Sequence, residues 1–336
     1  MKKSVIMVMM LMLIFVLSGC AQVLEKYNGP VDSTSTEEIL FTVPSGASTT
    51  SIANALFDSA LIQNVNAFKL NVKQMEVDGQ MKAGDYKLSK AMTASEIIQK
   101  LVDGETYVET VTFTIPEGYE VRQIVDKLEA EGLINRESFL EALESAPFDY
   151  RFLEGIDRSH LLEGYLFPDT YTIKTGASEV AIIDMMLKRF DQVFTDAYYE
   201  RTAELGLTVD EVVRLASIIE REARVKEEFA RVSSVFHNRL EIGMLLQSCA
   251  TVQFILQERK EVLLFADIEI DDPYNTYIYA GLPPSPIASP GELAISSALY
   301  PEDTKYLYFV TTEKNDGSHY FNETLAGHNR DSKKGN

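Results

Sequence analysis

A pattern of apolar residues near the start of the chain recurs 72 residues further along. Residues 41–46 have the sequence FTVPSG, and residues 113–118 repeat it as FTIPEG. The same apolar positions follow each copy: Ile52, Leu56, Leu61 and Ile62 after the first, and Ile124, Leu128, Leu133 and Ile134 after the second. Each copy predicts a strand, a turn made by Pro and Gly, and an amphipathic helix.

A second pair of motifs extends the repeat, since DYKL at 85–88 and TYTI at 170–173 are both followed, at one spacing, by paired isoleucines. We therefore expect an α+β protein with two related small α/β modules, at residues 39–107 and 108–190, and a mixed helical and strand domain at residues 191–330. The second module is expected to carry an insertion near residues 139–162. Two structural modules are the favoured interpretation of the repeat, and a glycan-binding role is the alternative.

Residues 205–236 predict a long helix that starts at Thr208. Thr208 and Glu211 form a capping box, which satisfies backbone N–H groups at the start of a helix. Apolar residues then recur at the three- and four-residue spacing of one buried face: Leu215, Ile218, Ile219, Val225 and Phe229. Glu222 falls in the middle of this face. The helical pattern continues to about Leu240.

A carboxylate on an apolar helix face is costly to keep charged, so we expect a raised pKa for Glu222 and a proton held near neutral pH. Such a group suits general acid catalysis. The alternative is a structural glutamate in a salt bridge with a basic residue from elsewhere in the chain. Glu220 lies roughly 200° around the helix from Glu222, so the two are not expected to act as a facing pair.

The C-terminal third predicts a long loop followed by a helix and a hairpin. Residues 267–291 are rich in Pro, Gly, Asn and Tyr, and long ordered loops tend to be functional. A helix is expected at 291–299, strands at 306–310 and 317–321, and a frayed tail at 331–336. Residues 163–171, EGYLFPDTY, are either core packing or a surface on which sugar rings stack.

The N-terminus has the pattern of a secretory signal. Lys2 and Lys3 precede a short apolar run that ends in LSGC at residues 17–20, which is similar to a bacterial lipobox. We expect a signal peptide at 1–19, a lipidated Cys20 and a flexible tether at 20–38, so that the protein is lipid-anchored on the outer face of the cell membrane. An uncleaved helical anchor is the alternative. Cys249 would then be the only remaining thiol.

The chain has a formal charge of −20, which argues against a nucleic-acid partner. The four histidines are scattered without metal-binding spacing, and neither a metal nor another cofactor is expected: His160, His237, His319 and His328. Cys249 is expected to be a small core residue, with a thiol nucleophile paired to His237 or His319 as the alternative.

Several further motifs occur in one order along the chain: ASIIERE at 216–222, NRL at 238–240, LQ at 246–247, YNTY at 274–277, GLPP at 281–284, YLYFV at 306–310 and HN at 328–329. Together with residues 163–171 and the earlier VPSG and AGDY signatures, they resemble the YceG-like (MltG) endolytic murein transglycosylases over about residues 39–330.

The resemblance implies cleavage, without water, of the β-1,4 bond between N-acetylmuramic acid and N-acetylglucosamine in nascent peptidoglycan. The product would carry a 1,6-anhydro-muramyl end. It places the family's catalytic glutamate on Glu222, with Glu220 in support, and Gln247, Asn275 and Tyr277 as residues that contact the glycan. It also implies that the first module is LysM-like and that cell-wall synthesis enzymes are possible partners.

Two departures from the family pattern leave an alternative open. Members commonly carry Asp-Pro where this chain has Cys249-Ala250, and a lipidated Cys20 would replace the usual transmembrane helix. A catalytically weak or inactive peptidoglycan-binding lipoprotein of the same fold is therefore the alternative function, and a solute-binding lipoprotein is a more distant one.

Overall fold

The computed structural model describes residues 27–156, 162–260, 262–314 and 316–334. The chain divides into two compact units, Met1–Glu109 and Thr110–Asn336. The expected signal peptide and Cys20 lie outside the described residues. Among the helices within the described ranges, none has the length and apolar character needed to cross a membrane.

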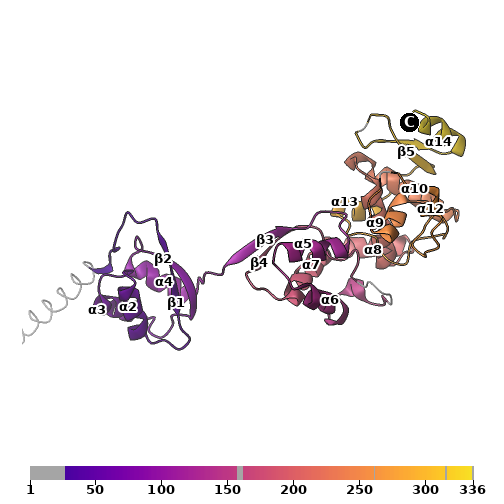
Figure 1. Cartoon of the computed structure of the whole chain (residues 1–336). Coiled ribbons are helices and arrows are strands. Elements are labelled where there is room, and N and C mark those ends of the chain that lie inside the picture. Colours follow the sequence, from indigo (N-terminus) through magenta and orange to yellow (C-terminus); the bar gives the residue numbers. More distant parts are fainter. Residues whose placement is uncertain (1–26, 157–161, 261, 315, 335–336) are drawn as a thin grey trace, which may run out of the picture. The chain divides into compact units, whose positions relative to one another are not determined.

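The first unit is a small α+β module (Figure 1). Strand β1 pairs antiparallel with β2, and three helices cover the pair. The elements are β1 (Glu38–Val43), α2 (Thr49–Asp58), α3 (Val65–Gln74), β2 (Gly84–Ser89) and α4 (Ala94–Asp103). Tyr86, Leu56 and Ile97 are fully buried at its centre, so this unit has a core of its own.

The second unit begins with the same order of elements. These are β3 (Thr110–Thr114), α5 (Val121–Ala130), α6 (Arg136–Ser145), β4 (Thr170–Lys174) and α7 (Glu179–Val193). In the first strand pair Phe41 lies opposite Tyr86, and in the second Phe113 lies opposite Tyr171. The repeat expected from the sequence is thereby confirmed in both element order and strand register.

The position of the insertion differs from the expectation. Phe139 lies on α6, which is the counterpart of α3 and belongs to the repeat. The extra residues come between the end of α6 and β4, and they include the 3₁₀ helix η1 (Arg151–Leu153). The sequence pattern missed this because the apolar positions of α3 and α6 do not match one another closely.

The tether is shorter than expected, because residues from Asn28 onward dock on the first module. The Asn28 side-chain carbonyl accepts hydrogen bonds from the Asn71 amide at 2.8 Å and from the Ser95 backbone N–H at 3.0 Å. Gln63 donates to the Pro30 carbonyl at 2.8 Å. Polar contacts of this kind produce no hydrophobic periodicity, so they could not be predicted from the spacing of apolar residues.

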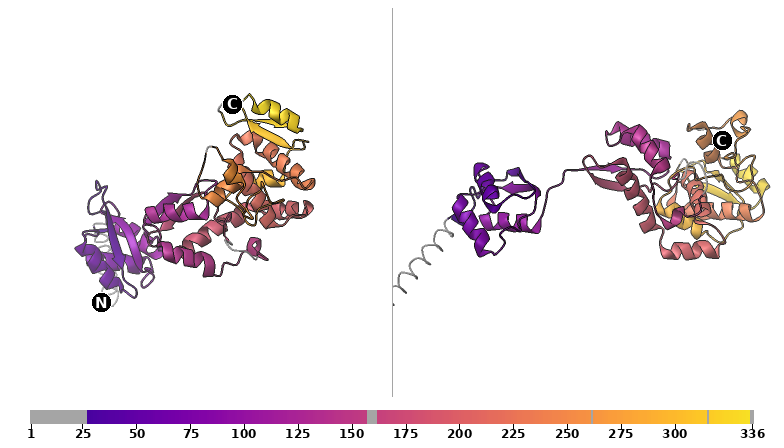
Figure 2. Two further views of the ribbon diagram at one scale, coloured as in Figure 1. Left: turned by 45° about the vertical axis from the view of Figure 1, so that its right-hand side comes forward. Right: turned by 90° about the horizontal axis from the view of Figure 1, so that it is seen from below.

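The repeated part of the second unit shares one core with the rest of that unit. Helix α7 continues through residue 190, where a domain boundary was expected. The remaining elements are α8 (Asp196–Glu204), α9 (Val209–Glu222), η2 (Lys226–Glu228), α10 (Phe229–Glu241), α11 (Cys249–Leu256), α12 (Phe265–Ile268), α13 (Glu292–Leu299), β5 (Tyr308–Thr311), β6 (His319–Asn322) and α14 (Leu325–Ser332). Figure 2 shows the second unit from two further directions.

The aromatic segment at 163–171 belongs to this core. Tyr165 and Phe167 are buried and contact Phe190 of α7. The Tyr165 hydroxyl donates to the Asp210 carboxylate at 3.0 Å, which joins the repeated part to α9. Core packing is therefore the correct interpretation of this segment in the structure, and sugar stacking is not.

The C-terminal segment is anchored rather than frayed as far as Lys334. Strands β5 and β6 form the expected antiparallel hairpin, and α14 packs against it. Buried Asp331 accepts a hydrogen bond from Asn322 at 3.1 Å and pairs with Lys334 at 2.7 Å. The expected tail at 331–336 is wrong for residues 331–334, because buried Asp331 is tied to Asn322 and pairs with the exposed Lys334.

Candidate active site

Glu222 is the last residue of α9. The predicted capping box is present, since the Thr208 backbone N–H donates to the Glu211 carboxylate at 2.8 Å and the Glu211 N–H donates to the Thr208 hydroxyl at 3.2 Å. The helix ends at Glu222 because Ala223 is extended, with φ −81° and ψ 137°. A single helix through residue 236 is therefore the wrong prediction, and so is a place for Glu222 in the middle of a buried face.

The apolar spacing continued across this break because α9 and α10 bury their apolar residues in the same core. Phe229 is buried, but it belongs to α10. Periodicity reports which side chains are buried and carries no signal for a turn between two helices that share a core. Because of the break, Glu222 lies half-buried at a helix end, where it lines a cavity.

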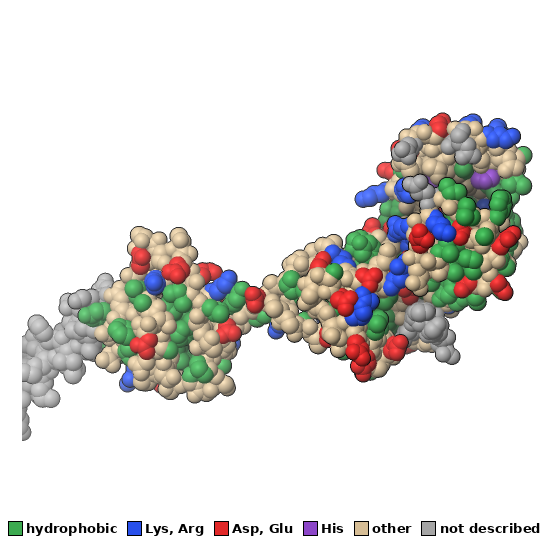
Figure 3. All heavy atoms as spheres, viewed as in Figure 1, with side chains coloured by type: hydrophobic (Ala, Val, Ile, Leu, Met, Phe, Trp, Pro, Cys, Tyr) green, Lys and Arg blue, Asp and Glu red, His purple; other side chains and the backbone are tan. Residues whose placement is uncertain are grey.

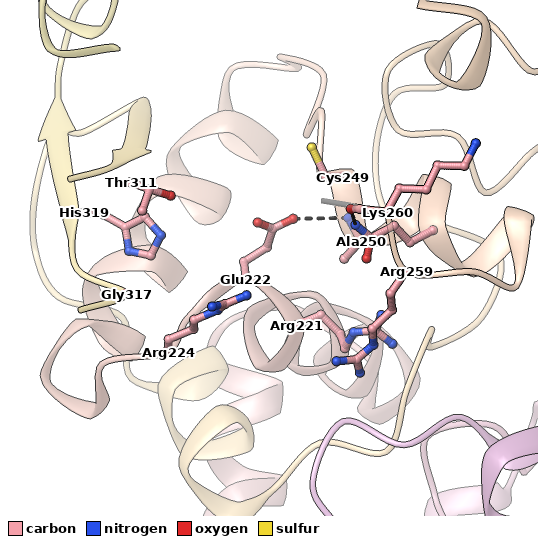
Figure 4. Close-up of a pocket in the computed structure, with 11 residues that line it drawn as sticks. Arg221, Glu222, Arg224, Cys249, Ala250, Arg259, Lys260, Thr311, Gly317 and His319 are labelled. Carbon is pink, nitrogen blue, oxygen red and sulfur yellow. Dashed lines mark hydrogen bonds between the residues drawn. The ribbon is translucent and has the colours of Figure 1, made fainter. Parts of the chain in front are cut away.

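Two groups at the start of α11 hold the Glu222 carboxylate. The Ser248 hydroxyl donates to Oε1 at 2.5 Å, and the Ala250 backbone N–H donates to the same oxygen at 3.3 Å. The N-terminus of α11 therefore faces the carboxylate, where the helix dipole favours negative charge. Figure 4 shows the second carboxylate oxygen turned away from Ala250, so one oxygen is held and the other is left for chemistry.

Two cavities meet at Glu222. The first has a volume of about 470 Å³ and is lined by basic and polar residues, among them Arg221, Arg224, Gln253, Arg259, Lys260 and His319. The second has a volume of about 320 Å³ and is lined by Arg239, Leu246, Gln247, Tyr277, Tyr308, Phe309, Leu325 and His328. Glu222 and Cys249 line both. Among the described residues that line the two cavities, Glu222 is the only carboxylic acid.

Glu220 points away from this cleft. Its carboxylate accepts the Gly291 backbone N–H at 3.0 Å and so ties α9 to the start of α13. Burial, opposed by this hydrogen bond and aided by the nearby Glu117 charge, raises the pKa of Glu220 to about 7. As expected, Glu220 and Glu222 do not face each other. The Glu220 carboxylate holds α9 against the start of α13 and does not contact the Glu222 carboxyl group.

Of the three residues expected to contact a glycan, two lie in the cleft. Gln247 and Tyr277 line the second cavity. Asn275 is fully buried, and its amide donates to the carbonyls of Ile268 at 2.9 Å and Ile270 at 2.8 Å. The expectation for Asn275 is wrong in this structure, because its side chain folds the 267–291 loop and does not reach the cleft surface.

Cys249 is exposed and lines the cleft, so its expected place in the core is wrong. Its sulfur lies 3.1 Å from the Tyr277 hydroxyl. The two histidines considered as thiol partners have other contacts: a His237 ring nitrogen lies 2.8 Å from the Ala298 carbonyl, and His319 Nδ1 lies 2.8 Å from the Glu228 carboxylate. The thiol became exposed because Cys249 is the first residue of α11 and faces the cleft rather than the core.

The sequence did not single out Ser248, Arg224 or Arg259, and it offered His319 only as a thiol partner and not as a residue beside Glu222. Ser248 precedes a helix, as N-cap residues do, and this was the one available signal for it. The other three come from separate segments that only the fold brings together. Within the described residues, no group of His, Cys, Asp and Glu side chains is arranged to hold a metal ion.

The second unit combines an α+β fold with a cleft whose described lining contains one carboxylic acid, held by hydrogen bonds, and the comparisons with known proteins agree with the motifs. The chain belongs to the YceG-like family, whose model matches residues 41–334. The resemblance found in the sequence is therefore confirmed.

Similar proteins cover most of this chain. The endolytic murein transglycosylase of Bacillus subtilis (strain 168) is 34% identical over 320 residues, which are 90% of this chain and 86% of that protein. The endolytic murein transglycosylase of Streptococcus pneumoniae serotype 2 (strain D39) is 30% identical over 327 residues, which are 90% of this chain but 59% of that longer protein. A crystal structure of a yceG-like protein from Listeria monocytogenes is 35% identical, with a TM-score of 0.59, and the match covers 88% of this chain and 99% of that one.

Proposed function

We propose that this protein is an endolytic murein transglycosylase in which Glu222 acts first as acid and then as base. The observation that carries the proposal is that Glu222 is the only carboxylic acid among the described residues lining the cleft. Hydrolytic glycosidases ordinarily use two carboxyl groups about 5 to 10 Å apart. A lytic reaction needs one, because a hydroxyl of the substrate replaces water as nucleophile.

The reaction returns Glu222 to its starting state. Protonated Glu222 gives its proton to the glycosidic oxygen while the bond from C1 of the muramyl residue to that oxygen breaks, and the bonding electrons stay with the oxygen. The resulting Glu222 carboxylate then takes the proton of the C6 hydroxyl of the same muramyl residue, and O6 bonds to C1. One strand leaves with a free hydroxyl and the other with a 1,6-anhydro-muramyl end.

The cleft is suited to cutting within a strand. Because two separate cavities share Glu222 in their lining, there is space for sugars on both sides of the cut bond. The second cavity presents Tyr277, Tyr308 and Phe309, and aromatic faces bury the apolar faces of sugar rings. Ser248 and the Ala250 N–H stabilise the carboxylate form that acts as the base.

The test compares Glu222→Gln with the unchanged protein on purified murein strands, with anhydro-muramyl ends measured by mass spectrometry. We expect anhydro ends from the unchanged protein and a loss of at least about a thousandfold in the variant, since the amide replaces both acid and base. Glu241→Gln is the control, because Glu241 is an exposed glutamate at the end of α10. Equal product from Glu222→Gln refutes the mechanism, and no product from the unchanged protein favours the peptidoglycan-binding alternative.

The first unit is proposed to be a LysM-like glycan-binding module. Support comes from its order of strand, two helices and antiparallel strand, and from its own hydrophobic core. Residues 27–109 expressed alone should fold and sediment with insoluble peptidoglycan. Recovery of the folded fragment in the supernatant would refute a binding role.

Attachment is proposed to occur through a lipid on Cys20, on the outer face of the cell membrane, where cell-wall synthesis enzymes are possible partners. The LSGC sequence at 17–20 after an apolar run is the support. Metabolic labelling with a radioactive fatty acid should mark the chain, and Cys20→Ala should abolish the label. Label retained in the variant would refute lipidation at Cys20.

A further inference from the structure

The cavity on one side of Glu222 is strongly basic in a protein whose formal charge is −20. Arginine, lysine and histidine side chains from five positions line it: Arg221, Arg224, Arg259, Lys260 and His319. Figure 3 shows Lys and Arg side chains gathered in a band on the second unit, while acidic side chains are spread over both units. A neutral sugar has no need of such a concentration of cations.

Three of these groups have carboxylate partners within the protein. Arg221 pairs with Glu120 at 3.2 Å, in a site where both side chains are at most 5% exposed. Lys260 pairs with Asp267 at 2.8 Å. His319 Nδ1 lies 2.8 Å from the Glu228 carboxylate, which also accepts the His319 backbone N–H. The charges of these partners compensate much of the basic character that the three groups bring.

The other two groups, the guanidinium cations of Arg224 and Arg259, are exposed, and no carboxylate among the described residues forms an ion pair with either. Arg224 follows α9 by two residues and Arg259 follows α11 by three. In Figure 4 they lie on different sides of Glu222. The cleft therefore carries positive charge around the one acid of its described lining.

Arg259 also lies beside Arg221 (Figure 4). Burial and then the charge of Arg259 lower the pKa of Arg221, and the Glu120 carboxylate opposes this. Two guanidinium groups held together repel each other, and an anion between them or against them removes that cost. Arginine is well suited to the task because its planar fork binds a carboxylate through two hydrogen bonds.

We propose that Arg224 and Arg259 bind carboxylates of the stem peptide carried by the muramyl residue next to the cut bond. The proposal rests on the function proposed above, since it names a further part of the substrate in the same cleft. Each muramyl residue in murein carries its peptide on the lactyl group, so a peptide anion lies beside every bond that can be cut. The enzyme should accordingly prefer strands that retain their peptides.

A lipid-linked pyrophosphate is the other anion that a growing strand carries. It lies at the strand end, and an endolytic cut leaves at least one further disaccharide between it and the acid. The basic cavity adjoins Glu222 directly, and so the peptide carboxylate fits its position better.

The experiment measures kcat/KM for anhydro-end formation on two substrates, murein strands with their peptides and the same strands stripped by an amidase. The full-length protein is compared with Arg224→Gln, Arg259→Gln and the double variant. Lys188→Gln is the matched control, because Lys188 is an exposed lysine on α7 outside the cleft. Circular dichroism confirms that each variant is folded.

We expect the unchanged protein to have a higher kcat/KM on peptide-bearing strands than on stripped strands. In the double variant the ratio of these two values should fall by about tenfold or more, because charge-assisted hydrogen bonds to the peptide are lost. An equal loss on both substrates, or an unaltered preference, overturns the proposal. No product from the unchanged protein on either substrate instead refutes the transglycosylase function, so the two failures are distinct.

A binding measurement separates the two anions. The free stem peptide, the same peptide with its carboxylates amidated, and inorganic pyrophosphate are titrated into Glu222→Gln, which cannot turn over strands. Tighter binding of the free peptide than of the amidated form, lost in Arg259→Gln, supports the proposal. Equal binding of both peptides, or saturable binding of pyrophosphate alone, overturns it.

Discussion

The Ser248 hydroxyl donates a hydrogen bond of 2.5 Å to Oε1 of Glu222, and this contact joins the C-terminus of α9 to the N-terminus of α11. The bond fixes the orientation of the one carboxylic acid in the described cleft lining. The Ala250 N–H reaches the same oxygen. The Glu222 carboxyl group is thus positioned by a segment 26 residues away in the chain.

Ser248→Ala tests this positioning. Loss of a hydrogen bond to a charged group costs about 1.5 to 3 kcal/mol, so kcat should fall roughly tenfold to a hundredfold with little change in KM. Steady-state formation of anhydro-muramyl ends checks it. Ser248→Thr, which keeps the hydroxyl, should recover most of the activity, and an unaltered kcat in the alanine variant would contradict the assigned role.

The buried Glu220 should make stability depend on pH. Its pKa is raised from 4.5 to about 7, chiefly by burial, so the folded protein binds this proton more tightly than the unfolded chain. The group therefore favours folding fully below its unfolded pKa, and that contribution is lost as the pH rises through about 7.

Glu220→Gln removes this dependence. Between about pH 4.5 and pH 8, the free energy of unfolding of the unchanged protein should fall relative to that of the variant by at most about 3 kcal/mol. Denaturant titrations at both ends of that range measure the difference. Parallel curves for the two proteins would show that the buried carboxyl group is not titrating there.

Asn275 and Gln247 should respond in opposite ways to truncation. Asn275→Ala leaves the carbonyls of Ile268 and Ile270 without their donors, so we expect a loss of about 2 to 4 kcal/mol in unfolding free energy. Gln247 is exposed with a φ of 46°, a conformation that glycine adopts easily. Gln247→Gly should keep the stability within about 1 kcal/mol and raise KM for glycan strands. Thermal denaturation and kinetics on both variants check the contrast, which a stable Asn275→Ala would contradict.

The Cys249 thiol reports the charge on Glu222. Although Cys249 is exposed at the cleft, desolvation of its thiol by the surrounding side chains raises its pKa. The hydrogen bond with Tyr277 opposes this shift, and the Glu222 charge adds to it. Since the thiolate is the reactive form, alkylation by iodoacetamide should be slower than for a free cysteine and should block activity by filling the cleft. At a pH where Glu222 is a carboxylate, Glu222→Gln should speed the alkylation. Mass spectrometry of the modified peptide measures the rate, and an unaltered or slower rate in the variant would contradict the electrostatic link.

The repeat shows how far apolar spacing alone can go. Phe41 and Phe113 predicted equivalent strands, and the structure places them opposite Tyr86 and Tyr171 in matching registers. The same kind of evidence failed at Ala223, where α9 ends, because α9 and α10 bury one continuous core and their apolar spacing has no gap. Polar docking, as of Asn28 on Asn71 and Ser95, was equally invisible.

The sequence by itself determined the α+β class, the repeated modules and the family, and with it the choice of Glu222. These depend on short motifs and on periodicities, which each segment carries locally. Only the tertiary structure decided that Glu222 ends its helix, that Ser248 holds its carboxylate and that Asn275 is buried. It also placed Arg224 and Arg259 in the cleft beside Glu222, where neither forms an ion pair with a carboxylate of the described residues. Those facts depend on contacts between segments far apart in the chain, and packing sets them rather than local pattern.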